Sequence, residues 1–177
     1  GAIEPVEEIS KFIKSVNNEV VFHVDAIQSF GKLIIHPRKI GIDLLSVSGH
    51  KIHGPKGIGF LYIDSAVKIK PIVFGGEQQK NVRSGTENVP GIVGFDTACQ
   101  IAIPNLESRV ENMSKVRKYL LAGIEDQIKD IKVNSPADGA ASVLNISFLG
   151  TRGEVLLHTL EQDNIFVSTG SACSSNK

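Results

Sequence analysis

The apolar positions in the first half of the chain follow two patterns, a helical spacing and then short continuous runs. Residues 6–16 repeat at the spacing of one helical face, which Pro5 can begin: Val6, Ile9, Phe12, Ile13 and Val16. Continuous apolar runs, which are typical of buried strands, follow at 20–24, 44–47 and 58–63. Buried strands with helical or irregular connections predict an α/β fold with a sheet buried on both faces.

The connections between these apolar runs indicate how the strands of the sheet are directed and which other elements the first half contains. Only a polar turn separates the run at 44–47 from the run at 58–63, so the sheet is expected to be mixed. Shorter apolar runs at 33–35 and 71–74 are further strand candidates. Residues 75–81 show no periodicity and are expected to form a surface loop, and a helix is expected over 89–101.

The pattern changes after Pro104, where a long amphipathic helix is expected to continue to about Ile128. Shorter elements follow it: strands at 131–133, 143–149 and 165–167, and a helix at 153–161. This sequence of elements is typical of a small α+β domain. We therefore expect two parts, residues 1–104 in a larger domain and residues 105–177 in a smaller one.

Composition excludes several classes of function. Nineteen basic and nineteen acidic residues cancel without forming a basic stripe, which argues against a nucleic-acid partner. No apolar run approaches the length of a membrane span, and no signal peptide is visible, although the chain opens in mid-pattern at Gly1. Cys99 and Cys173 make no disulfide framework, so a reducing, cytoplasmic setting is expected.

The polar stretch 46–59 lies between two predicted strands and holds most of the candidate chemistry. Gly49 and Gly54 have the spacing of a phosphate-binding loop, but Pro55 occupies the position of its lysine. His50 and His53 form an i, i+3 pair without a third metal ligand nearby, so we expect no metal site.

Lys51 offers a third interpretation of the same stretch. A lysine amine is a useful nucleophile when it loses its proton, which burial and nearby cations favour. Lys51 follows an apolar strand and adjoins His50, so it can be a lysine that forms a Schiff base. A polar turn with a solvated Lys51 explains the spacing equally well.

Four motifs follow one another along the chain and decide between these interpretations. They are His-Val-Asp-Ala-Ile-Gln-Ser at 23–29, Ser-Gly-His-Lys at 48–51 with Gly-Pro-Lys-Gly at 54–57, Arg-Ser-Gly-Thr-Glu-Asn at 83–88, and Ser-Thr-Gly-Ser-Ala-Cys-Ser-Ser at 168–175. In this order they resemble the middle of the pyridoxal-phosphate (PLP) dependent cysteine desulfurases of the NifS/IscS type, in the class V aminotransferase family. The resemblance implies fold type I, with helices on both faces of the mixed sheet, and a longer protein.

The resemblance assigns roles around the cofactor ring. Lys51 would carry PLP as a Schiff base, and Asp25 would pair with the ring nitrogen, which holds electrons best when protonated. Gln28 would bond the phenolic oxygen of the cofactor. From the residues alone, Asp25 suits a helix N-cap or a turn, and Gln28 suits an exposed surface position.

Further roles concern the phosphate and the sulfur. The resemblance implies that Ser48 and His50 contact the phosphate and that Thr86 reaches it from the other subunit of a homodimer. Cys173 would take sulfur from the substrate, and its glycine-serine loop is expected to be mobile and far from Lys51 without substrate. Taken alone, 83–86 is a polar turn and Cys173 an incidental surface cysteine. Cys99 suits packing on an apolar helix face.

The function implied is conversion of L-cysteine to L-alanine, with sulfur passed as a persulfide to an acceptor such as an iron–sulfur scaffold. Alternatives are a selenocysteine lyase, an aminotransferase relative, or a non-catalytic scaffold that binds sulfur acceptors. The first two would not need Cys173 in a mobile loop, and the third predicts no bound cofactor. The family's ring-stacking histidine, one phosphate-binding threonine and its substrate-binding arginine have no counterpart in these 177 residues.

Overall fold

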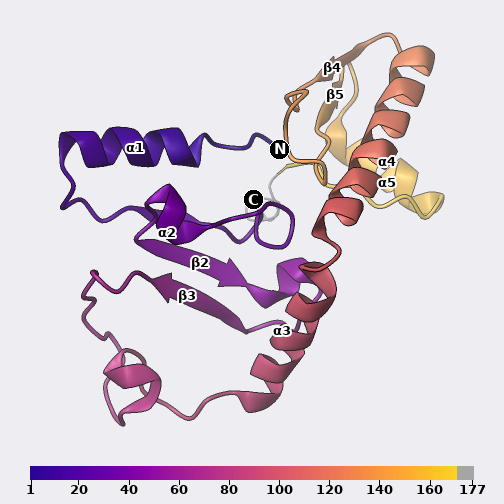
Figure 1. Ribbon diagram of the computed structural model, residues 1–177. Helices are drawn as coiled ribbons and strands as arrows, with labels where there is room; N and C mark the ends of the chain where they lie inside the picture. The colour runs from indigo at the N-terminus through magenta and orange to yellow at the C-terminus, as the bar shows by residue number, and fades with distance from the viewer. Residues whose placement is uncertain (171–177) are drawn as a thin grey trace. The chain divides into compact units, whose positions relative to one another are not determined.

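The computed structural model describes residues 1–170 and comprises two compact units (Figure 1). One unit is Glu4–Val110, and the other is Gly1–Ile3 together with the chain from Glu111 onward. The division falls inside helix α4 (Leu106–Gln127). The domain boundary expected between 104 and 105 stays a prediction.

The Glu4–Val110 unit contains a three-stranded sheet of order β1-β2-β3. β1 pairs parallel with β2, and β2 pairs antiparallel with β3, so the predicted mixed sheet is confirmed. The elements of this unit are α1 (Val6–Val16), β1 (His23–Asp25), α2 (Pro37–Ile40), β2 (Leu44–Ser48), the 3-10 turn η1 (Gly49–Ile52), β3 (Gly59–Ile63), η2 (Gln78–Asn81) and α3 (Val89–Ala102).

The register separates two faces of the sheet, of which one is apolar and the other is mixed, with Leu44, Leu61 and Ile63 beside polar residues. Leu45 lies between Val24 of β1 and Tyr62 of β3. Because side chains alternate along a strand, these residues share one face with Val47 and Phe60. The opposite face carries a set of polar side chains from β1 and β2, which we call the polar face: His23, Asp25, Ser46 and Ser48.

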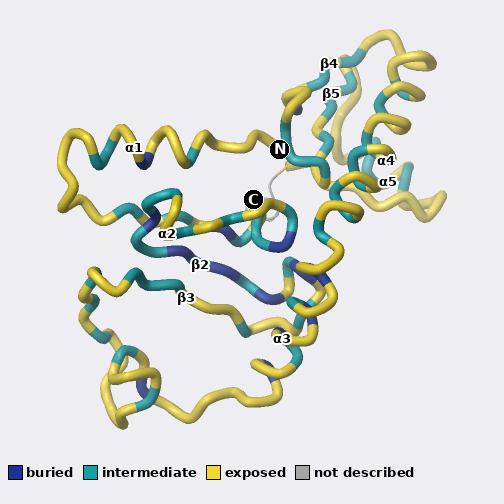
Figure 2. The backbone as a smooth tube through the Cα atoms, in the orientation of Figure 1, coloured by how far each residue is buried: buried dark blue, intermediate teal, exposed yellow. Residues whose placement is uncertain are grey.

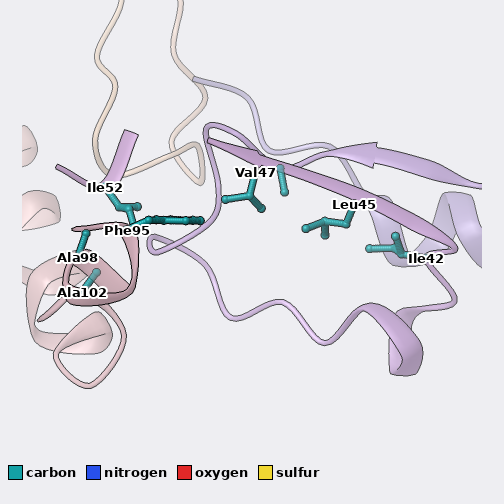
Figure 3. Close-up of a cluster of buried hydrophobic side chains, with 8 residues drawn as sticks. Ile42, Leu45, Val47, Ile52, Phe95, Ala98 and Ala102 are labelled. Atoms are coloured by element: carbon teal, nitrogen blue, oxygen red, sulfur yellow. The ribbon is translucent and has the colours of Figure 1, made fainter. Parts of the chain in front are cut away.

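The hydrophobic core is built on the apolar face and on α3 (Figure 3). Phe95, Ala98 and Ala102 recur at helical spacing along α3, and α3 packs against η1. Ile52, the last residue of η1, is only 4% exposed. Figure 2 shows the buried residues concentrated along β2 and the turn that follows it. The core therefore anchors the turn that carries Lys51. The full cluster is Ala26, Ile42, Leu45, Val47, Ile52, Phe95, Ala98 and Ala102.

Three predicted extended segments form no strand, and the strands predicted at 20–24 and 143–149 are confined to His23–Asp25 and Ile146–Phe148. Residues 71–74 form no strand, and Ile72 and Phe74 are 91% and 80% exposed. Residues 165–167 are also irregular, and 33–35 contribute only an isolated bridge between Phe30 and Leu33. An apolar run becomes a strand only when a neighbouring backbone satisfies its N–H and C=O groups, and no strand of residues 1–170 pairs with these three segments.

The second unit contains the rest of α4, a hairpin-like pair of strands and one more helix. β4 (Ile131–Val133) pairs antiparallel with β5 (Ile146–Phe148), and α5 (Gly153–Gln162) follows. These elements confirm the predicted α+β pattern of this part. In the part of the chain that the structure describes, every helix is too short or too polar to cross a membrane.

Candidate active site

Four of the predicted site residues lie at one edge of the sheet. Parallel strands have their carboxyl ends at the same edge, which is where ligands bind in sheets of this type. Asp25 is the last residue of β1, and Ser48 is the last residue of β2. His50 and Lys51 follow in η1, directly after Ser48. The fold therefore places Asp25, Ser48, His50 and Lys51 at one edge of the sheet, and their roles at a cofactor stay a prediction.

Asp25 has one oxygen held by the backbone and one that is open. Its Oδ1 accepts a hydrogen bond of 2.9 Å from the N–H of Ile27, and the N–H of Ala26 donates to the carbonyl of Ser46 at 2.9 Å. Within residues 1–170, Oδ2 accepts no hydrogen bond and Asp25 forms no ion pair. The turn interpretation thus explains Oδ1. The open Oδ2 is a fixed anionic acceptor for a cation.

Lys51 lies in a turn that is fixed at both ends. The N–H of Gly49 donates to the carbonyl of Ile58, and the N–H of Gly54 donates to the carbonyl of Gly49, each at 2.9 Å. His53 ends the turn in the left-handed conformation, with φ of 68°. Lys51 itself is half-buried, and no carboxylate of the described residues forms an ion pair with it. The amine is therefore available to a bound group.

A second lysine, Lys32, lies near Lys51. Burial lowers the pKa of Lys32, and the positive charges of Lys51 and Arg109 lower that pKa further. Gly31, the residue before Lys32, approaches Ile52 so closely that a Cβ there would lie 2.7 Å from Ile52 Cγ2. The loop after β1 consequently packs beside η1 and places a second lysine within electrostatic reach of Lys51.

Ser48 and His50 form a polar pair at the end of β2. Ser48 Oγ and His50 Nδ1 share a hydrogen bond of 2.8 Å, and the tautomer of the imidazole decides which atom donates. With a neutral imidazole, the shared bond leaves one N–H or O–H donor of this pair for the oxygens of an anion: Nε2–H of His50 if Ser48 donates to Nδ1, or the Ser48 hydroxyl if Nδ1–H donates to it. No group of three His, Cys, Asp or Glu side chains suited to a metal occurs in the described range.

Gln28 lies in the turn that follows Asp25. Two bonds to the carbonyl of Ala26 close this turn, from the N–H of Ser29 at 3.1 Å and from that of Phe30 at 2.8 Å. The side chain of Gln28 is exposed and makes no hydrogen bond to any described residue. Its amide therefore remains open to a ligand on the same edge.

No hydrogen bond within residues 1–170 links Thr86 to this edge. It lies in the long exposed segment between β3 and α3, which arches away from the sheet in Figure 1. This segment is held mainly by its own contacts: Ser84 Oγ donates to the carbonyl of Gly76 at 2.8 Å, and the N–H of Gly85 donates to Gln78 Oε1 at 3.1 Å. The cross-subunit role of Thr86 stays a prediction.

Two polar residues of the edge received no role from the sequence. His23 Nε2 and Ser46 Oγ share a hydrogen bond of 2.7 Å on the polar face, beside Asp25. Strict alternation within residues 44–48 could have pointed to Ser46, but its pairing with His23 depends on the register between two strands. Cys173, with its predicted mobility and its distance from Lys51, lies outside the described residues.

Comparisons with known proteins agree with this architecture. The whole chain, residues 1–177, matches the aminotransferase class-V family. Cysteine desulfurases named IscS from Dictyoglomus turgidum and Clostridium botulinum are 41% and 44% identical to it. Each comparison covers 99% of this chain but only 44% of the relative, so the chain spans less than half the length of these curated relatives.

Solved structures show the same similarity. A NifS-like protein is 39% identical, with a TM-score of 0.91 over 96% of this chain and 46% of that protein. A NifS-like protein from Rickettsia africae is 32% identical, with a TM-score of 0.88 over 97% of this chain and 47% of that one. These neighbours confirm the predicted α/β fold of type I.

Proposed function

The chain belongs to the aminotransferase class-V family, and on this premise we propose that it acts within a PLP-dependent cysteine desulfurase. The observation that carries the proposal is the single edge that holds Asp25, Lys51 and the Ser48–His50 pair. The names of the relatives support cysteine desulfurase over a selenocysteine lyase or another aminotransferase. L-cysteine would be converted to L-alanine.

The residues at the edge fit PLP. The open Oδ2 of Asp25 suits a protonated ring nitrogen, the Lys51 amine suits an aldehyde, and the paired side chains of Ser48 and His50 suit a phosphate. The amide of Gln28, which makes no hydrogen bond within the described region, suits the phenolic oxygen. When bound, PLP supplies an electron sink for the bonds around an amino acid's α-carbon.

Each side chain then has a defined task. Asp25 keeps a proton on the ring nitrogen by offering a fixed negative charge. Lys51 Nζ first holds the cofactor and then takes and returns the proton at the substrate's α-carbon. Cys173 Sγ, as a thiolate, would attack the sulfur of L-cysteine and become a persulfide. The Cβ–S bond of the substrate would break with its electron pair left on the carbon side, and Cβ would take a proton to complete L-alanine.

A homodimer that shares its sites is part of the proposal. The segment carrying Thr86 is exposed, and Ile72 and Phe74 expose apolar side chains just before it. Exposed apolar groups of this size favour burial against another surface. A two-fold dimer would bury them and carry each Thr86 to the phosphate in its partner.

The sulfur on Cys173 would leave for an acceptor protein, such as an iron–sulfur scaffold. A reducing, cytoplasmic compartment suits this chemistry, because the persulfide forms only on a free thiol.

The test uses the full-length protein with L-cysteine. We expect a yellow protein that forms L-alanine, and a Cys173→Ser variant that keeps the colour but forms no protein persulfide. Cys99→Ser is the matched control and should form persulfide normally, because Cys99 packs against the core. A colourless wild-type protein after reconstitution with PLP, or full persulfide formation by Cys173→Ser, would contradict the proposal.

A further inference from the structure

The Ser46 hydroxyl is a close neighbour of the Asp25 carboxylate. The two residues are register partners on parallel strands, and both side chains lie on the polar face. Paired strands run about 4.8 Å apart, so a serine at this position is within rotamer reach of a carboxylate across the strands. Ser46 could therefore donate a hydrogen bond to Asp25.

The structure shows a different arrangement. Ser46 Oγ lies 2.7 Å from His23 Nε2, and among residues 1–170 no hydrogen bond joins Ser46 Oγ to Asp25. The carbonyl of Ser46 meanwhile accepts from the N–H of Ala26 at 2.9 Å, which fixes the strand directly beside Asp25. His23 precedes Asp25 by two positions on the same strand and on the same face. In either imidazole tautomer, the hydroxyl oxygen is held against His23.

The alternative arrangement would interfere with a ligand. A hydroxyl that donates to a carboxylate makes a charge-assisted bond, which is stronger than a bond between neutral groups. A Ser46 hydroxyl without its histidine partner would consequently turn to the open Oδ2 of Asp25. It would occupy the acceptor that a cationic ring nitrogen needs.

We infer that His23 is a positioning residue that holds the Ser46 hydroxyl away from Asp25 and so keeps Oδ2 open for a cationic ring nitrogen. This inference rests on the proposed function, because PLP supplies that nitrogen. In this role His23 acts through Ser46, to which its Nε2 is bonded. The effect of His23 on PLP binding should therefore disappear when Ser46 is replaced, and this dependence can be measured.

The experiment measures PLP binding to the cofactor-free, full-length protein by the visible absorbance band, without substrate. His23→Ala should weaken binding roughly tenfold, the effect of one displaced charge-assisted hydrogen bond. Ser46→Ala should bind within about twofold of the wild type, because its only interfering hydroxyl is gone. The double variant His23→Ala/Ser46→Ala should bind as Ser46→Ala does.

Two further variants distinguish the hydrogen bond that positions the Ser46 hydroxyl from the packing of the His23 side chain. His23→Gln should bind normally, since its amide can still bond Ser46 Oγ. His23→Leu fills the same space without a nitrogen and should weaken binding as His23→Ala does, which also serves if the alanine variant does not fold. His36→Ala is the matched control, because His36 is exposed and its side chain caps no helix.

Recovery of binding in the double variant is the decisive result, since a histidine needed only for folding would not be rescued by a second deletion. Normal binding by both His23→Ala and His23→Leu would overturn the inference. A double variant as weak as His23→Ala would also overturn it. If the wild type itself binds no PLP, the proposed function fails, and the inference fails with it.

Discussion

Replacing Asp25 by asparagine separates the charge of this side chain from its role in the turn. An asparagine Oδ1 can still accept the N–H of Ile27, the bond that measures 2.9 Å in the structure. Asp25 is exposed and makes no ion pair within residues 1–170, so the substitution removes no packing and breaks no salt bridge. We expect the free energy of unfolding to change by less than about 0.5 kcal/mol.

Binding of PLP should respond much more strongly than stability. A hydrogen bond to a charged group contributes about 1.5–3 kcal/mol. At about 1.4 kcal/mol for each tenfold change in affinity, Asp25→Asn should bind PLP roughly 10- to 150-fold more weakly. Asp25→Ala loses the same affinity, and it also loses the Ile27 bond, which costs about 1 kcal/mol of stability.

The assay pairs two measurements on the full-length wild type and both variants. Titration of the cofactor-free protein with PLP gives the dissociation constants, and urea unfolding of the same samples gives the stabilities. Binding by Asp25→Asn within twofold of the wild type would refute the proposed pairing. A loss of stability by Asp25→Asn that equals the loss by Asp25→Ala would refute the assignment of Oδ1 to the turn.

Three further predictions test the core, a thiol and the shared site. Ile42 is 1% exposed, so truncating its side chain should destabilise the core. In urea titrations, Ile42→Ala should lower the free energy of unfolding by about 2–5 kcal/mol and Ile42→Val by about 0.5–1.5 kcal/mol. Equal losses for the two variants would contradict the tight packing of Ile42. Burial, followed by the charge of Asp96, raises the pKa of Cys99, which leaves less thiolate at neutral pH. Iodoacetamide should therefore modify Cys99 more slowly in the native protein than in urea, as followed by mass spectrometry, and equal rates would exclude the burial. Mixed dimers of Lys51→Ala and Thr86→Ala subunits should recover activity that neither variant has alone, whereas no recovery would place Thr86 within its own subunit's site.

The elements that could be predicted from the sequence are those whose apolar residues pack on a neighbour. The helix at 89–101 was expected from its composition, and α3 carries Phe95 and Ala98 into the core. The segment 71–74 is equally apolar but forms no strand, because strand formation depends on a pairing partner that local sequence does not contain. Local patterns thus identified the apolar segments. Which of these segments pair as strands depended on neighbouring strands that lie elsewhere in the sequence.

The candidate site likewise has features that could be predicted from the sequence and features that could not. Asp25 and Lys51 meet at one edge because parallel strands end together, a rule that can be applied to the sequence once the strands are known. The bond between His23 and Ser46 joins residues that are far apart in the chain, so it depends on a register that periodicity does not specify. The role proposed for Thr86 involves a second subunit, so it could not follow from the fold of one chain.

Reductive trapping of the cofactor tests the central claim most directly. Borohydride should fix PLP covalently to the full-length wild-type protein, and peptide mass spectrometry should locate the added mass on Lys51. Lys51→Ala should carry no trapped cofactor, whereas Lys56→Ala, which changes an exposed lysine of the same polar stretch, should be labelled as the wild type is. Trapped PLP on Lys32 or Lys56 of the wild type, or equal labelling of the Lys51→Ala variant, would contradict the assignment of Lys51 as the cofactor lysine.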